Sequence, residues 1–366
     1  METIRIGVIG AGIMGNRHIE QYKQIEGAEV VAVVDIVEEK AKRAAERHGV
    51  PHYYTDFRRM LERDDIDAVD VCLHNNLHAP VTIAALESGR HVYGEKPIAG
   101  SYADGLAMVE AAKRCGKMLH IQLSTLYTKE TKAAKAIIDG GALGNIYHAR
   151  SMGFRRRGRP YVDGYATPEF VQKEVAGGGA LFDMAVYHIA QILYLIGMPG
   201  VERVTGKVYQ ETPMDEERRR ISGYNVEEFA AGFVHLAGGI TLDIAESWAL
   251  HLDGFEGSSI VGSLGGLRLS PFSFHTIRWD LEMDATFNLD AMEYRRNQLD
   301  PDPARYRSSQ HHWIAALQGR VELLPTADIA LQTMLIQEGI YLADRLGREV
   351  TAEEIVKMSK STQLPV

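Results

Sequence analysis

The sequence predicts an α/β protein with an N-terminal doubly wound parallel sheet and a C-terminal α/β domain that holds a large, mostly antiparallel sheet. Strand-like and helix-like segments alternate over roughly the first 120 residues, which is the pattern of a parallel sheet covered by helices. Beyond residue 146, strand-like segments follow one another with few helices between them, which is typical of antiparallel pairing. Because 366 residues are too many for one ordinary core, we place a boundary near residue 125, giving domains 1–125 and 126–366.

The first βαβ unit spans residues 4–35. An apolar strand leads into Gly10-Ala11-Gly12-Ile13-Met14-Gly15, a helix runs to about residue 25, and a second apolar strand covers residues 30–34. Gly10 permits the turn off the strand, Gly12 lets the backbone approach a pyrophosphate, and Gly15 lets helix and strand pack closely. Asp35 follows the last glycine by 20 residues, which is the spacing of a Rossmann dinucleotide-binding unit with the phosphates at the helix N-terminus.

Asp35 also indicates which dinucleotide is bound. A carboxylate at the end of the second strand accepts hydrogen bonds from the adenosine ribose and repels a 2′-phosphate. The next residues, Ile36 to Glu39, include no arginine that would receive such a phosphate. The sequence therefore favours NAD over NADP.

The rest of the N-terminal domain continues the same alternation. We expect helices at residues 38–47, 57–62, 79–88 and 102–115, and strands at residues 53–54, 68–73, 91–94 and 118–122. In the second domain we expect helices at 131–139, 179–196, 311–318 and 327–345, and strands at 147–154, 201–209, 228–236, 240–250, 258–261 and 266–269. The charged stretch of residues 210–225 is predicted to be a loop.

Composition narrows the classes of protein and partner. Hydrophobic residues make up 45% of the chain, as in globular proteins, and the net charge of -9 argues against nucleic acid as a partner. No apolar run approaches the roughly 20 residues that span a bilayer, and no basic and apolar leader precedes the first strand. Cys72 and Cys115 lie in apolar patterns, which excludes a disulfide framework. These features predict a cytoplasmic protein that does not bind membranes.

Three further motifs carry a family resemblance. Leu73-His74-Asn75-Asn76-Leu77-His78 and Gly94-Glu95-Lys96-Pro97 each follow a predicted strand, and the segment from Gly177-Gly178-Gly179 through Asp183 to Tyr187-His188 opens a helix. Together with the glycine loop and Asp35, these motifs resemble the family of glucose-fructose oxidoreductase and inositol dehydrogenase over essentially the whole chain. The resemblance implies an enzyme that transfers hydride between NAD and a hydroxyl group.

The resemblance gives Lys96 a position at the nicotinamide, where cofactor and substrate meet, and gives Asp183 the task of orienting the substrate. The physics agrees for Lys96, which follows the carboxyl end of a parallel strand, where open α/β sheets bind ligands. The alternative is a solvated surface lysine. His74 replaces the proline usual in the family. The residues expected to line the cofactor are Gly10, Gly12, Ile13, Met14, Gly15, Asp35, Leu73, His74, Asn75, His78, Glu95 and Lys96.

Two residues compete for the role of proton acceptor. Many family members have Asp-x-Gly-x-His, whereas here tyrosine occupies the histidine position and His188 follows it, so Tyr187 resembles the branch that uses a tyrosine. In a helix Asp183 and Tyr187 share a face, and His188 points roughly 140° away from Asp183. A phenol, however, has a pKa near 10, and imidazole titrates near working pH, so Lys96 would have to depress the pKa of Tyr187. Tyr187 is favoured as the proton acceptor. His188 is the second candidate, and the alternative for His188 is a hydrogen-bonded core residue.

The substrate side of the site is less sharply defined. Arg155, Arg156, Arg157 and Arg159 follow the first strand of the second domain and could receive an anionic group, although a solvated charge run explains most of them. In the family this segment approaches the substrate, so Arg155 and Arg157 are singled out, on one face if the segment stays extended. Weaker candidates are Tyr161, Asp163, His251 and His311. No metal-ligand spacing occurs, so no metal is expected.

We therefore expect an NAD-dependent oxidoreductase that acts on a secondary hydroxyl of a sugar, a sugar derivative or a cyclic polyol. Lys96 would stabilise the alkoxide and Tyr187 or His188 would take its proton. One alternative is a glycoside-cleaving enzyme that uses NAD transiently without net redox change. Another is a non-catalytic sensor of a dinucleotide or sugar. The resemblance also implies a homo-oligomer, a dimer or tetramer, formed through the sheet of the second domain.

Overall fold

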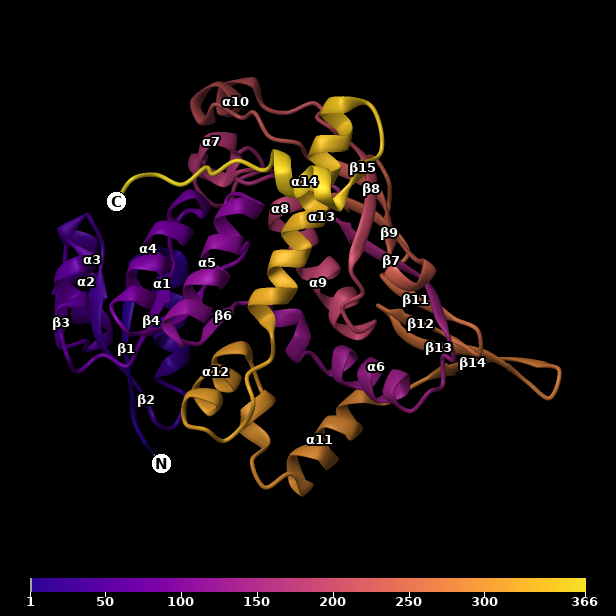
Figure 1. Ribbon diagram of the computed structural model, residues 1–366, viewed down its shortest axis with the longest axis horizontal. Helices are drawn as coiled ribbons and strands as arrows, with labels where there is room; N and C mark the ends of the chain where they lie inside the picture. Colours follow the sequence, from indigo (N-terminus) through magenta and orange to yellow (C-terminus); the bar gives the residue numbers. More distant parts are fainter. Residues whose placement is uncertain (1) are drawn as a thin grey trace.

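The computed structural model describes residues 2–366, and its first domain is built on a six-stranded parallel sheet (Figure 1). The strand order is β3-β2-β1-β4-β5-β6, with every neighbouring pair parallel. The strands are β1 Ile4–Ile9, β2 Ala28–Val34, β3 His52–Tyr54, β4 Ala68–Val71, β5 His91–Gly94 and β6 Leu119–Ile121. The order reverses at β1 and β4, so a ligand is expected outside the carboxyl ends of these strands. The predicted doubly wound sheet is confirmed.

Helices connect these strands and cover both faces of the sheet. They are α1 Ile13–Tyr22, α2 Glu38–His48, α3 Phe57–Leu61, α4 Asn75–Glu87 and α5 Tyr102–Cys115, followed by the short 3₁₀ helix η1 Ser124–Tyr127. Asp56 and Ser101 cap the N-termini of α3 and α5 with their side chains. Most residues of the central strands β1, β4, β5 and β6 are buried, as a sheet covered on two faces requires, whereas the edge strand β3 is not.

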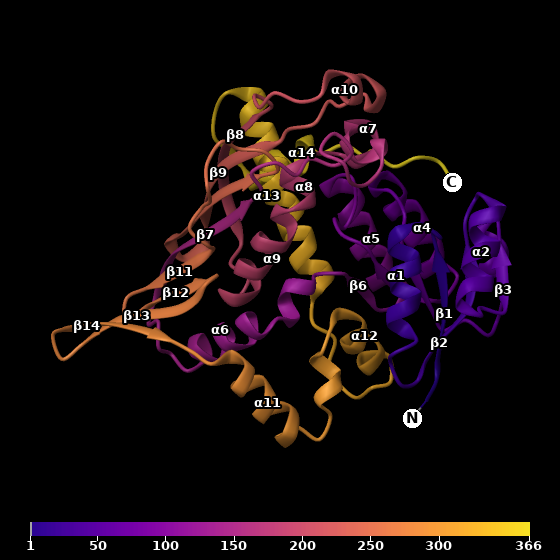
Figure 2. The same ribbon diagram turned by 180° about the vertical axis from the view of Figure 1, so that it is seen from behind.

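The second domain is built on a nine-stranded, mostly antiparallel sheet, as predicted. Its order is β14-β13-β12-β11-β7-β10-β9-β8-β15, and only β10 and β7 pair in parallel. The strands are β7 Ile146–Phe154, β8 Val201–Tyr209, β9 Phe229–Leu236, β10 Ile240–Ser247, β11 Ser259–Gly262, β12 Gly266–Leu269, β13 Phe272–Arg278, β14 Leu281–Thr286 and β15 Val350–Thr351. The hairpin of β13 and β14, which the sequence analysis did not anticipate, extends away from the body of the molecule (Figures 1 and 2).

Helices cover one face of this sheet and leave the other open. The helical segments are α6 Lys129–Asp139, η2 Pro168–Val171, α7 Lys173–Ala176, α8 Ala180–Asp183, α9 Ala185–Leu195, α10 Glu216–Ser222, η3 Ala237–Gly239, α11 Leu289–Leu299, η4 Pro303–Tyr306, α12 Ser309–Leu317, α13 Thr326–Leu346 and α14 Ala352–Met358. Two expectations were wrong in detail. The single helix expected at 179–196 is interrupted at Met184, and the loop expected at 210–225 contains α10.

The C-terminal helices return to the first domain. Trp313 and Ile314 of α12 belong to the same buried cluster as Ile6 and Tyr22, and the first half of α13 packs into the core around β4 and β5. Figure 2 shows α13 running between the two sheets. The division into residues 1–125 and 126–366 therefore stays a prediction. Within residues 2–366, none of the helices has the length and apolar character needed to span a bilayer.

Candidate active site

The glycine loop turns from β1 into α1 and leaves the N-terminus of that helix open. Gly10 has a φ of 102°, and a Cβ on Gly15 would lie 1.8 Å from the carbonyl oxygen of Gly10, so both positions require glycine. A Cβ on Gly12 would meet no atom within 4 Å, so the space beside the loop is free. No described side chain caps α1 and no acid lies in its first turn, which leaves its N–H groups available to a phosphate.

Asp35 holds this loop in place from the end of β2. One carboxylate oxygen accepts a hydrogen bond from the backbone N of Ala11 at 3.0 Å, and the other accepts one from the N of Val37 at 2.9 Å. Ile13 and Ile36, which lie beside the loop and Asp35, expose 75% and 89% of their surface. An open helix N-terminus, an anchored acid and two uncovered apolar side chains together fit a dinucleotide.

Lys96 and Asp183 form an ion pair that joins the two domains. The Nζ atom of Lys96 lies 2.7 Å from Oδ1 of Asp183 and 3.0 Å from its main-chain oxygen. Burial lowers the pKa of Lys96, but the charge and hydrogen bond of Asp183 together with the neighbouring Tyr187 and Glu95 outweigh burial, so the pKa is raised above its usual value. Burial likewise raises the pKa of Asp183, and Lys96 outweighs this effect, so that pKa is lowered. Both residues are therefore ionised at neutral pH.

Asp183 can reach Lys96 with both its side chain and its carbonyl because the helix is interrupted after it. In a continuous helix the carbonyl of residue 183 would accept the N–H of Tyr187, but that N–H donates instead to the oxygen of Met184 at 3.1 Å. Upstream, the carboxylate of Glu227 accepts hydrogen bonds from the N–H groups of Gly179 and Leu181. A Cβ on Gly179 would lie 1.9 Å from the main-chain oxygen of Glu227, so glycine at this position permits the close approach of the two segments.

Tyr187 lies beside Lys96, with the Nζ atom 4.9 Å from the centre of the phenol ring. Its main-chain oxygen accepts a hydrogen bond from Thr125 at 3.0 Å, which fixes the start of α9 against the first domain. Burial raises the pKa of the Tyr187 phenol and Lys96 opposes this, but the net direction is upward. Lys96 thus lowers this pKa, as a proton acceptor at position 187 would require, but its effect is smaller than that of burial.

His188 turns the other way, toward the sheet of the second domain. Its Nδ1 atom lies 2.9 Å and 3.1 Å from the two carboxylate oxygens of Glu246 in β10, which also accepts a hydrogen bond from Ser151. Burial lowers the pKa of His188, but the charge and hydrogen bond of Glu246 outweigh burial, with Arg155 opposing, so the pKa is raised. The contact with a buried carboxylate is compatible with both predicted roles of His188, the proton acceptor and the hydrogen-bonded core residue.

Asp183 has two further partners in the second domain. The indole Nε1 of Trp248 donates to Oδ2 of Asp183 at 3.1 Å, and Nη1 of Arg155 lies 3.8 Å from the same oxygen. Arg155 also donates to the hydroxyl of Tyr165 at 2.6 Å, and its side chain is 41% exposed. Of the two arginines singled out from the sequence, Arg155 therefore borders the Lys96–Asp183 pair.

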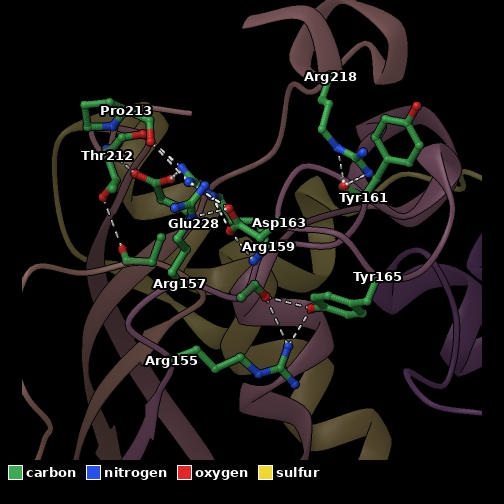
Figure 3. A network of polar contacts seen from close by, with 12 residues as sticks. Arg155, Arg157, Arg159, Tyr161, Asp163, Tyr165, Thr212, Pro213, Arg218 and Glu228 are labelled. Atoms are coloured by element: carbon green, nitrogen blue, oxygen red, sulfur yellow. Dashed lines mark hydrogen bonds and ion pairs between the residues drawn. The ribbon is translucent and has the colours of Figure 1, made fainter. Parts of the chain in front are cut away.

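Arg157 belongs to a network of ion pairs around Asp163 (Figure 3). Its side chain is 75% exposed and pairs with Asp163 at 3.0 Å, whereas the buried Arg159 bonds both Asp163 and Glu228. The condition under which Arg155 and Arg157 would share a strand face is not met, because β7 ends at Phe154 and the chain turns. These ion pairs brace the loop that presents Arg155 and Tyr165.

The weaker candidates support local structure. The carbonyl of Tyr161 accepts a hydrogen bond from Arg218 at 2.9 Å, and the guanidinium lies over the Tyr161 ring. Asp163 belongs to the loop braces just described. His311 bonds Ser308, the N-cap of α12, at 2.9 Å, and His251 is exposed in the chain that follows β10. None of these contacts joins a reacting group.

The segment after β4 links the domains at the same edge of the sheet. Asn75 donates to the carbonyl of Ala176 at 2.6 Å, directly before the glycine-rich segment. The ring of His74, the N-cap residue of α4, packs edge-on against Phe170. His78 is buried, and its two ring nitrogens lie within hydrogen-bond distance of the carbonyls of Leu73 and Pro97. His78 therefore ties this segment to the Lys96-Pro97 turn and is covered by it.

A buried polar cluster lies behind Lys96. His18 of α1 lies 2.9 Å from carboxylate oxygens of both Asp70 and Glu95, and Glu95 accepts a hydrogen bond from the backbone N of Lys96 at 3.0 Å. Burial lowers the pKa of His18, but its neighbours Cys72 and Asp70 outweigh burial and raise it. His18, Asp70 and Cys72 are also close enough to hold a metal ion. Since they already bond one another, the contacts are explained by a hydrogen-bonded cluster that anchors the Glu95-Lys96 turn.

The chain matches two family models, which together define its class. Residues 4–123 match the oxidoreductase family with an NAD-binding Rossmann fold, and residues 131–268 match the GFO/IDH/MocA C-terminal domain. The chain is thus an oxidoreductase-family protein with an NAD-binding domain. It belongs to the GFO/IDH/MocA family, the family of glucose-fructose oxidoreductase and inositol dehydrogenase.

Individual relatives agree with this family. The chain is 26% identical over 355 residues to D-glucoside 3-dehydrogenase of Escherichia coli (strain K12), and the matched region covers 95% of this chain and 97% of the relative. It is 29% identical over 194 residues to myo-inositol 2-dehydrogenase of Thermotoga maritima, covering 53% of this chain and 55% of the relative. A solved structure of levoglucosan dehydrogenase with NADH and L-sorbose shares the fold, with a TM-score of 0.81, 22% identity, and coverage of 97% of this chain and all of the other.

Proposed function

We propose that this protein is an NAD-dependent dehydrogenase acting on a secondary hydroxyl of a sugar, a sugar derivative or a cyclic polyol. The observation that carries the proposal is the Lys96 ammonium, fixed by Asp183 of the second domain, at the turn that follows β5 of the Rossmann sheet. Relatives named as glucoside and inositol dehydrogenases support the substrate class. A Rossmann-bound NAD supplies a hydride acceptor.

The residues divide into cofactor-holding and reacting groups. The glycine loop and the N–H groups of α1 hold the pyrophosphate, and Asp35 receives the ribose while it anchors the loop. Lys96 donates a hydrogen bond to the substrate oxygen and stabilises the negative charge that develops as the hydroxyl loses its proton. Asp183 keeps Lys96 charged and orients it, which is consistent with the raised pKa of Lys96.

The proton of the hydroxyl needs an acceptor, and His188 fits this role better than Tyr187. Both follow Asp183 at the start of α9, but burial raises the pKa of the phenol further above working pH. His188 has a carboxylate partner and a pKa raised above its usual value near 6.5, which brings it toward neutral pH. Tyr187 remains the second candidate because its ring lies beside the Lys96 ammonium.

Arg155 and Tyr165 complete the substrate side. Their side chains bond each other beside Asp183, on a loop braced by buried ion pairs, so they form a rigid polar surface facing the reacting group. The Nε and Nη2 atoms of Arg155 have no protein acceptor within residues 2–366 and can donate to substrate oxygens. Arg157 is not part of this surface.

The proposal includes assembly into a homo-oligomer and a cytoplasmic location. On the sheet face opposite α9 and α13, Tyr209 and Phe229 stack at 5.5 Å, and Tyr209 and Phe233 are 37% and 36% exposed. Aromatic side chains on an uncovered sheet face favour a contact with a second copy. Sedimentation of the wild type and of Phe233→Glu tests this, since a dimer or tetramer should dissociate in the variant.

A substrate panel tests the proposed activity. The purified protein is incubated with inositols, hexoses, levoglucosan, sugar acids and glucosides, each with NAD or NADP, and NADH formation is followed by absorbance. We expect NADH to accumulate with a sugar or polyol and NAD to be preferred. Release of aglycone from a glucoside with no net NADH would favour the redox-neutral glycosidase instead. Binding of NAD and sugar with no conversion of any hydroxyl compound would favour a sensor.

A further inference from the structure

Glu246 is a buried carboxylate in an otherwise apolar row. The residues of β10 that point toward α9 are Leu242, Ile244 and Glu246, and the glutamate is 0% exposed. A charged group in this position is costly unless it is paired, so a strand that only filled the core would carry a third apolar residue there. The pairing of Glu246 therefore calls for a role of its own.

The partners of Glu246 identify that role. His188 Nδ1 lies 2.9 Å from Oε1 and Ser151 donates to the same oxygen at 3.3 Å. Because the carboxylate accepts at Nδ1, that nitrogen carries the hydrogen, and Nε2 is the nitrogen with a free lone pair. Nε2 has no hydrogen-bond partner among residues 2–366, and the His188 side chain is 28% exposed.

The neighbouring strand is shaped to admit this pair. Gly153 of β7 lies opposite Glu246 in the parallel register. A Cβ at Gly153 would come within 1.8 Å of Oε2 of Glu246 and within 2.7 Å of Cε1 of His188. A side chain at this position would displace both groups, so glycine, glutamate and histidine form one arrangement contributed by three elements.

We propose that Glu246 is the positioning residue for the proton acceptor: it holds the imidazole of His188 with Nε2 directed at the substrate hydroxyl. The inference rests on the proposed dehydrogenase function and deepens it. In the oxidation direction the O–H bond of the substrate breaks and its proton moves to Nε2 of His188, while the hydride of the same carbon leaves to NAD. Glu246 keeps its charge throughout and stabilises the imidazolium that forms, with Lys96 on the substrate oxygen.

The pH dependence of kcat/KM distinguishes a positioning role of Glu246 from a merely structural one, because the loss of a merely structural contact would not shift it. Among the described residues, the charged groups that act on the His188 imidazole are Glu246 from β10 and Arg155 after β7. The acceptor must be neutral, so kcat/KM for oxidation rises as pH passes the pKa of His188. In Glu246→Gln the carboxylate charge is lost and burial dominates, so this limb should move to lower pH by about 1–3 units.

Turnover should fall as well, because the neutral amide holds the imidazole more weakly and does not stabilise the imidazolium. We expect the plateau of kcat/KM in Glu246→Gln to drop about 10- to 100-fold, by analogy with other residues that orient a functional histidine, with the dissociation constant of NAD unchanged. Asp243→Asn is the matched control. It lies on the same strand, pairs with Arg150 at 3.0 Å on the outer face, and should leave both plateau and limb in place.

A double-mutant cycle separates a role through His188 from a general effect on the fold. His188→Gln should lose about 10²- to 10⁴-fold in kcat, and adding Glu246→Gln to it should cost nothing further. If Glu246→Gln fails to fold, the histidines of the wild type can be titrated by NMR, with the signal of His188 assigned by its absence in His188→Gln. The pKa of His188 should then lie above about 6.5. Glu246→Asp, which keeps the charge, should restore part of the loss.

The inference would be overturned by an unmoved pH limb in Glu246→Gln, by additive losses in the double variant, or by an imidazole that titrates below its usual value. Each of these results leaves NADH formation by the wild type intact, so it overturns the role of Glu246 alone. Absence of NADH formation by the wild type with every sugar and polyol would instead overturn the proposed function.

Discussion

The Nζ atom of Lys96 touches Asp183 twice, at 2.7 Å from its carboxylate and at 3.0 Å from its main-chain oxygen. One residue belongs to the turn after β5 and the other to the end of α8, so the contact joins the Rossmann domain to the second domain. The interruption of the helix at Met184 leaves that main-chain oxygen free to accept. The ammonium is therefore held in one direction by two acceptors, which is the preorganisation that stabilisation of an alkoxide needs.

Lys96→Ala should abolish most turnover while NAD binding stays nearly intact. The ammonium is the only group we assign to the developing alkoxide, and loss of one such donor typically lowers kcat about 10²- to 10³-fold. Steady-state kinetics and NAD titration by fluorescence check this. Lys113→Ala is the control, since Lys113 is exposed and pairs with Asp328 at 4.0 Å on the surface. Near-normal turnover in Lys96→Ala would show that the assignment is wrong.

Asp183→Asn should make turnover sensitive to high pH. Lys96 acts as the ammonium, so activity is present below its pKa and is lost as pH rises through it. Burial lowers the pKa of Lys96, and Asp183 makes the largest of the contributions that together outweigh burial. Without the carboxylate less charge opposes burial, so the alkaline limb of kcat should move to lower pH by about 1–3 units. A limb that stays where the wild type has it would contradict this reading of the pair.

Tyr187→Phe and His188→Gln distinguish the two proton acceptors. In His188→Gln, kcat should fall about 10²- to 10⁴-fold and the acidic limb of the pH profile should disappear, because the acceptor is gone. Tyr187→Phe keeps the ring beside Lys96 and should retain the limb with a smaller loss, about tenfold or less. Rate profiles between pH 5 and 10, measured roughly every half unit, decide between them. The reverse ranking would return the role to the phenol.

Arg155→Met should weaken substrate use far more than Arg157→Met. Arg155 presents unused donors beside Asp183, and loss of a charged hydrogen bond to substrate lowers kcat/KM by about 10- to 100-fold. Arg157 is 75% exposed and paired with Asp163, so its loss should have little effect on kcat/KM. Equal effects of the two substitutions would mean that the loop acts only through its overall charge.

The first domain could be predicted almost entirely from the sequence. Continuous apolar strands, glycines in the first turn and Asp35 each depend on local spacing, and the structure confirms the parallel sheet. The hairpin of β13 and β14 was missed because most of its β14 side chains are exposed, so no buried face produces an apolar alternation. The return of α12 to the first domain depends on tertiary packing around Trp313, which no local pattern reports.

The site could be predicted only in part, because some of its residues meet through tertiary contacts that no local pattern reports. The family resemblance implied a common site for Lys96 and Asp183, and helix spacing related Asp183 to Tyr187, but no proline or glycine marks the helix interruption at Met184. The sequence analysis missed Trp248, Tyr165 and His18, because they reach the site through contacts between segments that are distant in the sequence. Glu246 did leave a signal, because it interrupts the alternation Leu242, Ile244, Glu246 at an inward position. A charge in a buried row is a sequence feature that points to a partner, here His188.

The most direct measurement is NADH formation from a sugar or polyol by the wild type and by Lys96→Ala, with NAD binding measured on both proteins. We predict that the wild type accumulates NADH, and that the variant binds NAD with similar affinity but forms NADH at least about 10²-fold more slowly. Equal rates in the two proteins, or a wild type that binds NAD and sugar without forming NADH, would contradict the account.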